Sequence, residues 1–227
     1  MTDVLAPALT LDANGRAVVL FGRNVASSKF ALAKTLLGLA ERADDRVPLE
    51  ELALPFAQHL CAPLQGVDRQ TTSRSSQFLD ACRAFNRGEL AEEALIGTTA
   101  RLGFTNVLDA FHVVGRGPVP VRFLGDERSG RRGAGAIRLT DDLRHLAGSL
   151  QGGSLAEEAE ARWRLVETAW QLELPRAGLA VQAGAARDLL FVEGQRIRRT
   201  NLTRVRGRGT ATRGAAASTA GPRPRWR

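Results

Sequence analysis

Arginine is concentrated at the C-terminal end of this 227-residue chain. Residues 196–227 contain ten arginines and no Asp or Glu, and because the whole chain carries +8, residues 1–195 carry −2. A guanidinium group is a planar fork of donors that matches phosphate oxygens, and clustered arginines bind nucleic acid with strong salt dependence. We therefore predict nucleic acid as the partner. The predicted nucleic-acid-binding residues are Arg196, Arg198, Arg199, Arg204 and Arg206.

A second group of arginines, Arg128, Arg131 and Arg132, lies at the tip of a predicted β-hairpin. For this group we favour solvated side chains that keep the protein soluble, because a charged run on a surface usually has that role. For the C-terminal arginines we favour phosphate binding, and solvated side chains are the alternative.

The three histidines form no recognisable catalytic or metal centre. His59, His112 and His145 have no second His or Cys at metal-ligand spacing, and the chain contains no Cys-x-x-Cys. A packed or helix-capping position is favoured for His112, and a solvated position for His145. Neither a phosphate-cradling glycine loop nor a Gly-x-Ser-x-Gly motif is present. We predict no catalytic residue and no metal ligand in this chain.

Two pairs of adjacent carboxylates, Asp141–Asp142 and Glu157–Glu158, fall in the first turns of predicted helices. Negative charge at this end of a helix interacts favourably with the helix dipole, so capping is favoured over acid–base catalysis. Ser154 and Glu157 match a capping box, in which each side chain bonds the other residue's backbone N–H.

The elements that hold these residues are mainly helices. Before them, Leu9–Leu11 and Ala17–Phe21 predict a β-hairpin, because Asn14-Gly15 favours the positive φ angles of a tight turn. Apolar residues spaced by three and four positions then predict helices. These begin near Ser27, at Pro48 and around Phe78, the last one ended by Gly88, and two more cover 89–102 and 106–114.

The second half of the chain mixes strands with helices. Val119–Leu124 and Ala136–Leu139 predict a β-hairpin around the loop Gly125–Gly135, and Thr140 is expected to cap a short helix. A long helix from Ser154 to a stop at Pro175 follows. Its predicted buried face consists of Leu155, Ala159, Trp163, Val166 and Trp170. Two strand-like runs come last, Leu179–Ala183 and Leu189–Val192.

These patterns predict an α+β fold: a predominantly helical single domain with small β-hairpins and a disordered basic C-terminal tail. Cys61 and Cys82 lie in apolar surroundings and are expected to be buried thiols rather than a disulfide. No apolar run reaches the roughly 18–20 residues of a membrane span, and the N-terminus lacks the features of a signal peptide. We expect a cytoplasmic protein with no membrane partner.

Five segments together resemble the N-terminal region of a group of bacterial HNH endonucleases. They are Leu20–Ala40, Phe104–Phe123, Gly135–Leu143, Glu158–Leu174 and Arg196–Arg206. The resemblance spans nearly all of residues 9–206, and its motifs are packing signatures rather than catalytic ones. It implies an N-terminal domain over 1–195, a basic connector toward the nuclease module over 196–206, and a disordered Arg/Gly/Ala tail over 207–227.

In that family, a segment similar to Thr200–Arg206 leads into an Asn-Gly-Tyr stretch, a Cys-x-x-Cys and a histidine-bearing ββα-metal module. This chain continues instead with the Arg-, Gly- and Ala-rich residues 207–227. With permitted codons read in a shifted frame, Gly209–Gly221 yields Asn-Gly-Tyr and Cys-Phe-Tyr-Cys at the family's spacing. We therefore expect that the frame has shifted after about Arg206, in a GC-rich gene.

The resemblance implies metal-dependent phosphodiester hydrolysis. In HNH endonucleases a histidine base activates water and a divalent metal stabilises the leaving oxygen. Both belong to the missing module, so we expect this chain to be an inactive, DNA-binding remnant with no cofactor of its own.

Two other functions stay open. A non-catalytic regulatory module with a genuine basic tail would bind nucleic acid or a protein partner. An enzyme of another class would build its site from residues such as His112 with Asp109 or Glu167.

Overall fold

The computed structural model describes residues 9–21, 27–67, 70–71, 75–115, 117–129, 134–150 and 152–171, together with the strand residues 179–181, 190–192 and 195–196. The chain divides into two compact units, Met1–Leu174 and Pro175–Arg227. Each unit is described by itself below.

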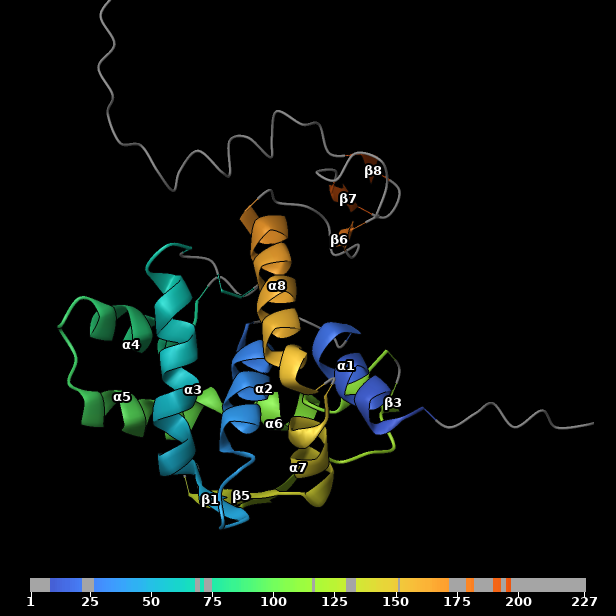
Figure 1. The fold of residues 1–227 in the computed structure, drawn as a ribbon. Helices are drawn as coiled ribbons and strands as arrows, with labels where there is room; N and C mark the ends of the chain where they lie inside the picture. The colour runs from blue at the N-terminus through green and yellow to red at the C-terminus, as the bar shows by residue number, and fades with distance from the viewer. Residues whose placement is uncertain are drawn as a thin grey trace, which may run out of the picture. The chain divides into compact units, whose positions relative to one another are not determined.

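The first unit is built mainly from helices, with short antiparallel strands between them (Figure 1). The predicted predominantly helical α+β fold is confirmed. Its helices are α1 (Leu11–Phe21), α2 (Ser28–Leu39), α3 (Leu49–Leu64), α4 (Gln77–Asn86), α5 (Glu92–Thr98), the π-helix η1 (Thr99–Gly103), α6 (Val107–Ala110), α7 (Asp141–Gly148) and α8 (Gly152–Gln171). Its strands are β1 (Arg46–Pro48), β2 (Val113–Val114), β3 (Gly117–Pro118), β4 (Leu124–Arg128) and β5 (Gly135–Leu139).

The strands form two small antiparallel sheets. One has the order β1-β5-β4, and the other pairs β2 with β3. In Figure 1, β1 and β5 lie at the lower end of the unit, below α2 and α3. None of the helices within the described residues is long and apolar enough to cross a membrane.

The core lies where α2, α3 and α8 pack together. Phe30, Phe56 and Phe104 are among its largest fully buried side chains. The Phe56 ring stacks on Phe78 of α4 with centroids 5.7 Å apart and contacts Phe104 at 4.9 Å, and Phe30 stacks on Trp163 at 5.8 Å. The Phe56 contacts connect α3 to α4 and to the residue after η1, and the Phe30 contact connects α2 to α8; all five rings belong to one apolar cluster.

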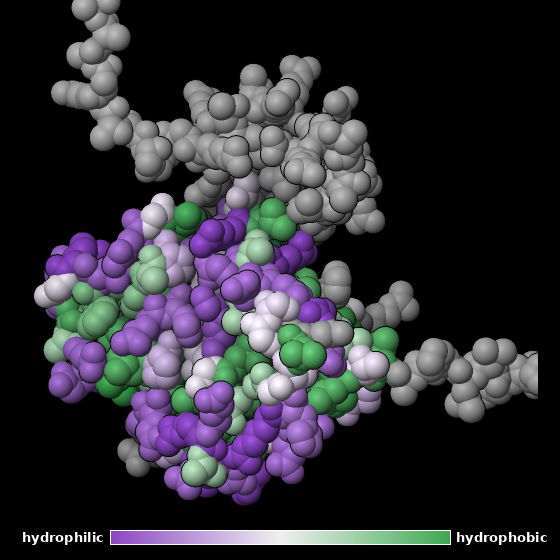
Figure 2. All heavy atoms as spheres, viewed as in Figure 1, coloured by the Kyte–Doolittle hydropathy of each residue, from purple (hydrophilic) through white to green (hydrophobic). Residues whose placement is uncertain are grey.

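The surface of this unit is mixed in character. Figure 2 shows hydrophilic residues over most of the face formed by α3 and α8, and hydrophobic residues gathered over α4 and α5. Phe85 of α4, Leu90 between α4 and α5, and Ile96 of α5 are partly buried.

The predicted N-terminal β-hairpin is wrong, because residues 11–21 form helix α1. The Asn14 side chain does not make a turn: its Nδ2 donates to the carbonyls of Leu9 and Thr10, each at 3.0 Å. Gly15 lies against Leu146 of α7, and a Cβ there would approach Leu146 Cδ2 to 2.7 Å. Asn-Gly therefore permits close helix packing here, where the local pattern indicated a tight turn.

Several local signals for helix ends are confirmed. Pro48 precedes α3, and Gly88 has a φ of +73° after α4, the left-handed conformation that ends a helix. Thr140 caps α7 by accepting a hydrogen bond from the backbone N–H of Leu143, and Asp141 and Asp142 occupy the first turn of that helix.

The two helices predicted over 89–102 and 106–114 are interrupted. The first is divided into α5 and η1, and the second ends at Ala110 because Val113–Val114 pairs with β3. Lys29 of α2 contributes to this ending, since its Nζ donates to the carbonyl oxygens of Val113 at 3.0 Å and Ala110 at 3.4 Å.

The predicted hairpin over residues 119–139 exists, but its first strand begins later than expected. β4 runs over Leu124–Arg128, whereas the expected strand was Val119–Leu124. The backbone before β4 is held by His112: the N–H of Val119 donates to the His112 carbonyl, and the N–H of Phe123 donates to His112 Nε2, both at 2.9 Å. These bonds take the place of sheet pairing.

Helix α8 begins at Gly152, so the predicted capping box at Ser154 and Glu157 is wrong. Ser154 lies inside the first turn, and its hydroxyl donates to Glu158 at 2.9 Å. The predicted buried face is confirmed, with Leu155, Ala159, Trp163 and Trp170 buried and Val166 partly buried. The expected stop at Pro175 lies outside the described residues.

The second unit contains an antiparallel sheet of the order β6-β7-β8, formed by β6 (Leu179–Val181), β7 (Leu190–Val192) and β8 (Gln195–Arg196). The two predicted strand-like runs contain β6 and β7. The predicted division at residues 195/196 and 206/207 stays a prediction, and residues 197–227 lie outside the described part of the chain.

Candidate functional site

The predicted nucleic-acid-binding arginines fall mostly beyond the described residues. Only Arg196 belongs to a described element: it ends β8, and its backbone is paired with Phe191 of β7. Arg198, Arg199, Arg204 and Arg206 lie outside. The phosphate-binding set therefore stays a prediction from the sequence.

The two units differ strongly in charge. Met1–Leu174 carries a net charge of −2, whereas Pro175–Arg227 carries +10. Most of the described cations of the first unit are paired with carboxylates from the same unit. The paired residues include Arg16, Lys34, Arg42, Arg46, Arg83, Arg87, Arg128, Arg138, Arg144 and Arg164. Excess positive charge is confined to the second unit.

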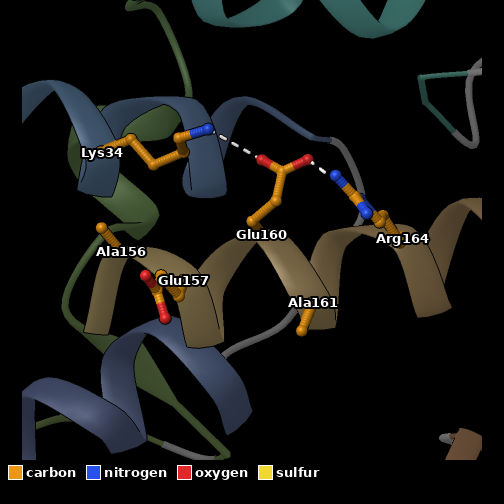
Figure 3. Close-up of a pocket in the computed structure, with 6 residues that line it drawn as sticks. All are labelled: Lys34, Ala156, Glu157, Glu160, Ala161 and Arg164. Carbon is orange, nitrogen blue, oxygen red and sulfur yellow. Dashed lines mark hydrogen bonds and ion pairs between the residues drawn. The ribbon is translucent and has the colours of Figure 1, made fainter. Parts of the chain in front are cut away.

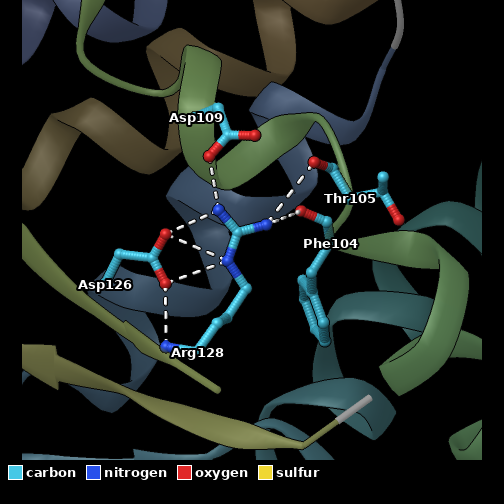
Figure 4. Close-up of polar contacts among 5 residues, drawn as sticks. All are labelled: Phe104, Thr105, Asp109, Asp126 and Arg128. Carbon is cyan, nitrogen blue, oxygen red and sulfur yellow. Dashed lines mark hydrogen bonds and ion pairs between the residues drawn. The ribbon is translucent and has the colours of Figure 1, made fainter. Parts of the chain in front are cut away.

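Arg128 is the most extensively bonded of these arginines (Figure 4). Its Nε donates to Asp126 at 2.9 Å, and its Nη2 donates to both Asp126 and Asp109. Its Nη1 donates to the carbonyl oxygens of Phe104 and Thr105, at 3.3 and 3.4 Å. The expectation of a solvated side chain is therefore wrong for Arg128, which connects β4 to the segment between η1 and α6. Arg131 and Arg132 lie outside the described residues.

Replacing Arg128 with alanine is expected to lower the free energy of unfolding by about 1–2 kcal/mol. Charge-assisted hydrogen bonds of this kind contribute about 1.5–3 kcal/mol when buried, and the Asp109 partner here is largely exposed. Urea unfolding followed by circular dichroism measures the loss. Arg122→Ala, at an exposed arginine nearby in sequence, is the matched control. Equal losses for the two variants would contradict the role given to Arg128.

His112 is a buried neutral imidazole. It is 4% exposed, its Nε2 accepts a hydrogen bond from the Phe123 N–H, and its ring contacts Phe111 edge-on and Phe123 face-on. Burial, together with the nearby charges of Arg122 and Lys29, lowers the pKa of His112 to about 4. The favoured interpretation as a packed histidine agrees with these contacts, and His145 is exposed on α7 as expected.

The alternative pairing of His112 with Asp109 or Glu167 is not favoured by the geometry. Asp109 is held by Arg128, and Glu167 accepts a hydrogen bond from Gln70. Both carboxylates thus bond to other side chains, and the Nε2 of His112 is occupied by a backbone N–H.

A shallow pocket of about 390 Å³ lies along α8 beside α2 (Figure 3). Glu160 stands between two cations, with Lys34 Nζ at 2.7 Å and Arg164 Nε at 3.2 Å. Burial raises the pKa of Glu160, but the hydrogen bonds and charges of the two cations outweigh it and lower that pKa below its ordinary value. The pocket's charged side chains balance each other, so it shows no preference for an anion or a cation.

A buried polar network lies between α2 and α8, and the sequence did not predict it. Gln70 Oε1 accepts hydrogen bonds from the Ser27 hydroxyl and from Trp163 Nε1, the latter at 3.0 Å, and Gln70 Nε2 donates to Glu167 and to the Val67 carbonyl. Burial raises the pKa of Glu167. Since Gln70 uses both its oxygen and its amide nitrogen, the network stabilises the fold and has no free group of Gln70 to offer a ligand.

Among the described residues, no group of three or more His, Cys, Asp and Glu side chains is placed to hold a metal ion. Comparisons with protein-family models, with curated proteins and with solved structures find no match to this chain.

Proposed function

We propose that this chain is the N-terminal region of an HNH endonuclease-like protein and that it binds DNA through the arginines of its C-terminal segment. The observation that carries the binding proposal is the separation of charge between a unit of −2 and a unit of +10. Arginines with no carboxylate in their own segment are available to phosphates, whereas those of the first unit are largely neutralised by ion pairs.

The proposed mode of binding is electrostatic. Each guanidinium replaces a counterion at a phosphate, so affinity depends on salt and carries little information about base sequence. If Arg196, Arg198, Arg199, Arg204 and Arg206 each contact one phosphate, a fourfold rise in salt weakens binding about 500-fold.

This chain would bind DNA, and hydrolysis would be carried out by the HNH module of the family that the chain resembles. That module would supply the histidine base and the divalent metal. The two recognisable candidates in the first unit, buried His112 and the charge-balanced pocket beside α8, are engaged in packing and ion pairs.

The experiment compares the full chain with a variant in which the five predicted arginines are glutamine. Fluorescence anisotropy with two unrelated DNA duplexes is measured at low salt and at several higher salt concentrations. We expect equal affinity for both duplexes, a steep salt dependence, and a loss of about 100-fold or more in the variant. The control variant carries glutamine at the exposed first-unit positions Arg87, Arg101 and Arg122, and should retain the affinity.

The other outcomes are equally informative. No binding by the full chain at low salt would overturn the proposal. Tail-dependent binding that strongly prefers one duplex would favour the alternative, a regulatory module whose basic tail recognises a particular sequence.

A further inference from the structure

Two free cysteines face each other where α3 contacts α4. Cys61 of α3 is 5% exposed, and Cys82 of α4 is fully buried. The Cys61 thiol donates to the carbonyl oxygen of Cys82 at 3.9 Å. The two cysteines of the described chain therefore lie in contact at the place where these two helices pack together.

Other contacts hold the two helices together around this point. Asn86 Nδ2 of α4 donates to the Cys61 carbonyl at 2.7 Å, and Phe56 of α3 stacks on Phe78 of α4 with ring centroids 5.7 Å apart. The fold thus already holds Cys61 and Cys82 close to each other. A covalent bond between them would incur little further loss of conformational entropy in the folded state.

We propose that Cys61 and Cys82 are a redox pair, which a small-molecule disulfide converts into a covalent link between α3 and α4. The Cys61 thiolate attacks one sulfur of the small disulfide, forming a mixed disulfide and releasing one small thiol. Cys82 then attacks the Cys61 sulfur, which forms the link and releases the second small thiol. The protein loses two electrons and two protons, and the small disulfide is reduced to two thiols.

The order of attack follows from the surroundings of the two sulfurs. Cys61 is 5% exposed, whereas Cys82 is fully buried. Since the small disulfide must reach a thiol before that thiol can attack it, Cys61 reacts first and Cys82 resolves the mixed disulfide. Because both thiols are buried, the rate of reaction depends on how often this part of the fold opens, so the equilibrium is a better readout than the rate.

The test equilibrates the full chain with mixtures of reduced and oxidised glutathione, in buffer and in concentrated urea. After acid quenching and alkylation, mass spectrometry measures the fraction of chain with the Cys61–Cys82 link, recognised by the loss of two hydrogens. We expect the equilibrium constant for forming the link to be at least about tenfold larger in the folded chain than in urea. The reason is that the folded chain already holds the two cysteines close together, whereas the unfolded chain must lose conformational entropy to bring them together. A constant equal to or below the urea value would overturn the proposal.

Two single variants test the order of attack under native conditions. Cys82→Ala should accumulate a glutathione mixed disulfide on Cys61, whereas Cys61→Ala should leave Cys82 largely unmodified, with circular dichroism confirming the fold. The reverse pattern would overturn the assigned order. If either variant fails to fold, the comparison of the unaltered chain in buffer and in urea still decides whether the pair forms.

Discussion

Replacing Trp163 with alanine is expected to lower the free energy of unfolding by about 3–5 kcal/mol, as large-to-small changes of buried aromatic residues do. Trp163 is 2% exposed, and its ring stacks on Phe30 between α8 and α2. Its Nε1 also donates to the buried Gln70 side chain, so the change removes packing and a hydrogen bond together. Urea unfolding followed by circular dichroism measures the loss.

Trp163→Phe separates these two contributions. It keeps an aromatic ring against Phe30 and removes the N–H, while Gln70 Oε1 still accepts the Ser27 hydroxyl. We expect a loss of about 1 kcal/mol for the hydrogen bond, plus a smaller packing loss. If Trp163→Phe loses as much unfolding free energy as Trp163→Ala, the hydrogen bond contributes more than the packing. A small loss for Trp163→Ala would contradict the placement of Trp163 in the core.

The second large effect is expected in acid. The pKa of His112 is about 4 in the folded chain, because burial and neighbouring cations disfavour the proton, and about 6.5 in the unfolded chain. Between these values the unfolded state binds more protons, so the free energy of unfolding falls as the pH falls from about 6.5 to about 4. His112 is expected to lower the free energy of unfolding by up to about 3 kcal/mol at a pH of about 4. Above a pH of about 6.5 it causes no such loss.

The difference between the unaltered chain and a His112→Phe variant isolates this contribution. The variant is expected to be less stable at neutral pH by about 1–3 kcal/mol, because the Phe123 N–H loses its acceptor, but to lose less stability on acidification. Two other groups also change stability with pH. The lowered pKa of His59 makes the free energy of unfolding fall in acid, and the raised pKa of Glu167 has the opposite effect. Both groups are present in the two proteins compared, so their effects cancel in the difference. Identical acid profiles for the His112→Phe variant and the unaltered chain would contradict the prediction.

Helix ends and buried faces could be predicted because their signals are local. Gly88 ends α4 since only a residue that tolerates positive φ is suited there, and Thr140 caps α7 through an N–H three residues away. The apolar spacing through Leu155 and Trp163 likewise identified the buried face of α8. The separation of charge could also be read directly, because it depends on composition alone.

The candidate sites of the first unit could not be predicted in the same way. Nothing near Arg128 in the sequence indicates Asp109 or the Phe104 carbonyl as its partner, and nothing near Gln70 indicates Trp163 or Ser27. Such contacts join residues that are far apart along the chain. They exist only once the helices have packed.

The sequence by itself determined where α2, α3, α4 and α7 begin, which face of α8 is buried, and where the excess arginines lie. Tertiary structure decided whether Asn14-Gly15 turns or continues a helix, and whether residues 119–123 pair in the sheet or bond to His112. In both cases a weak local preference competes with a contact to a residue far away in the sequence. Gly15 packs on Leu146, and the Phe123 N–H donates to the His112 imidazole. Burial of those partners contributes more free energy than a turn propensity does, so the distant contact prevails.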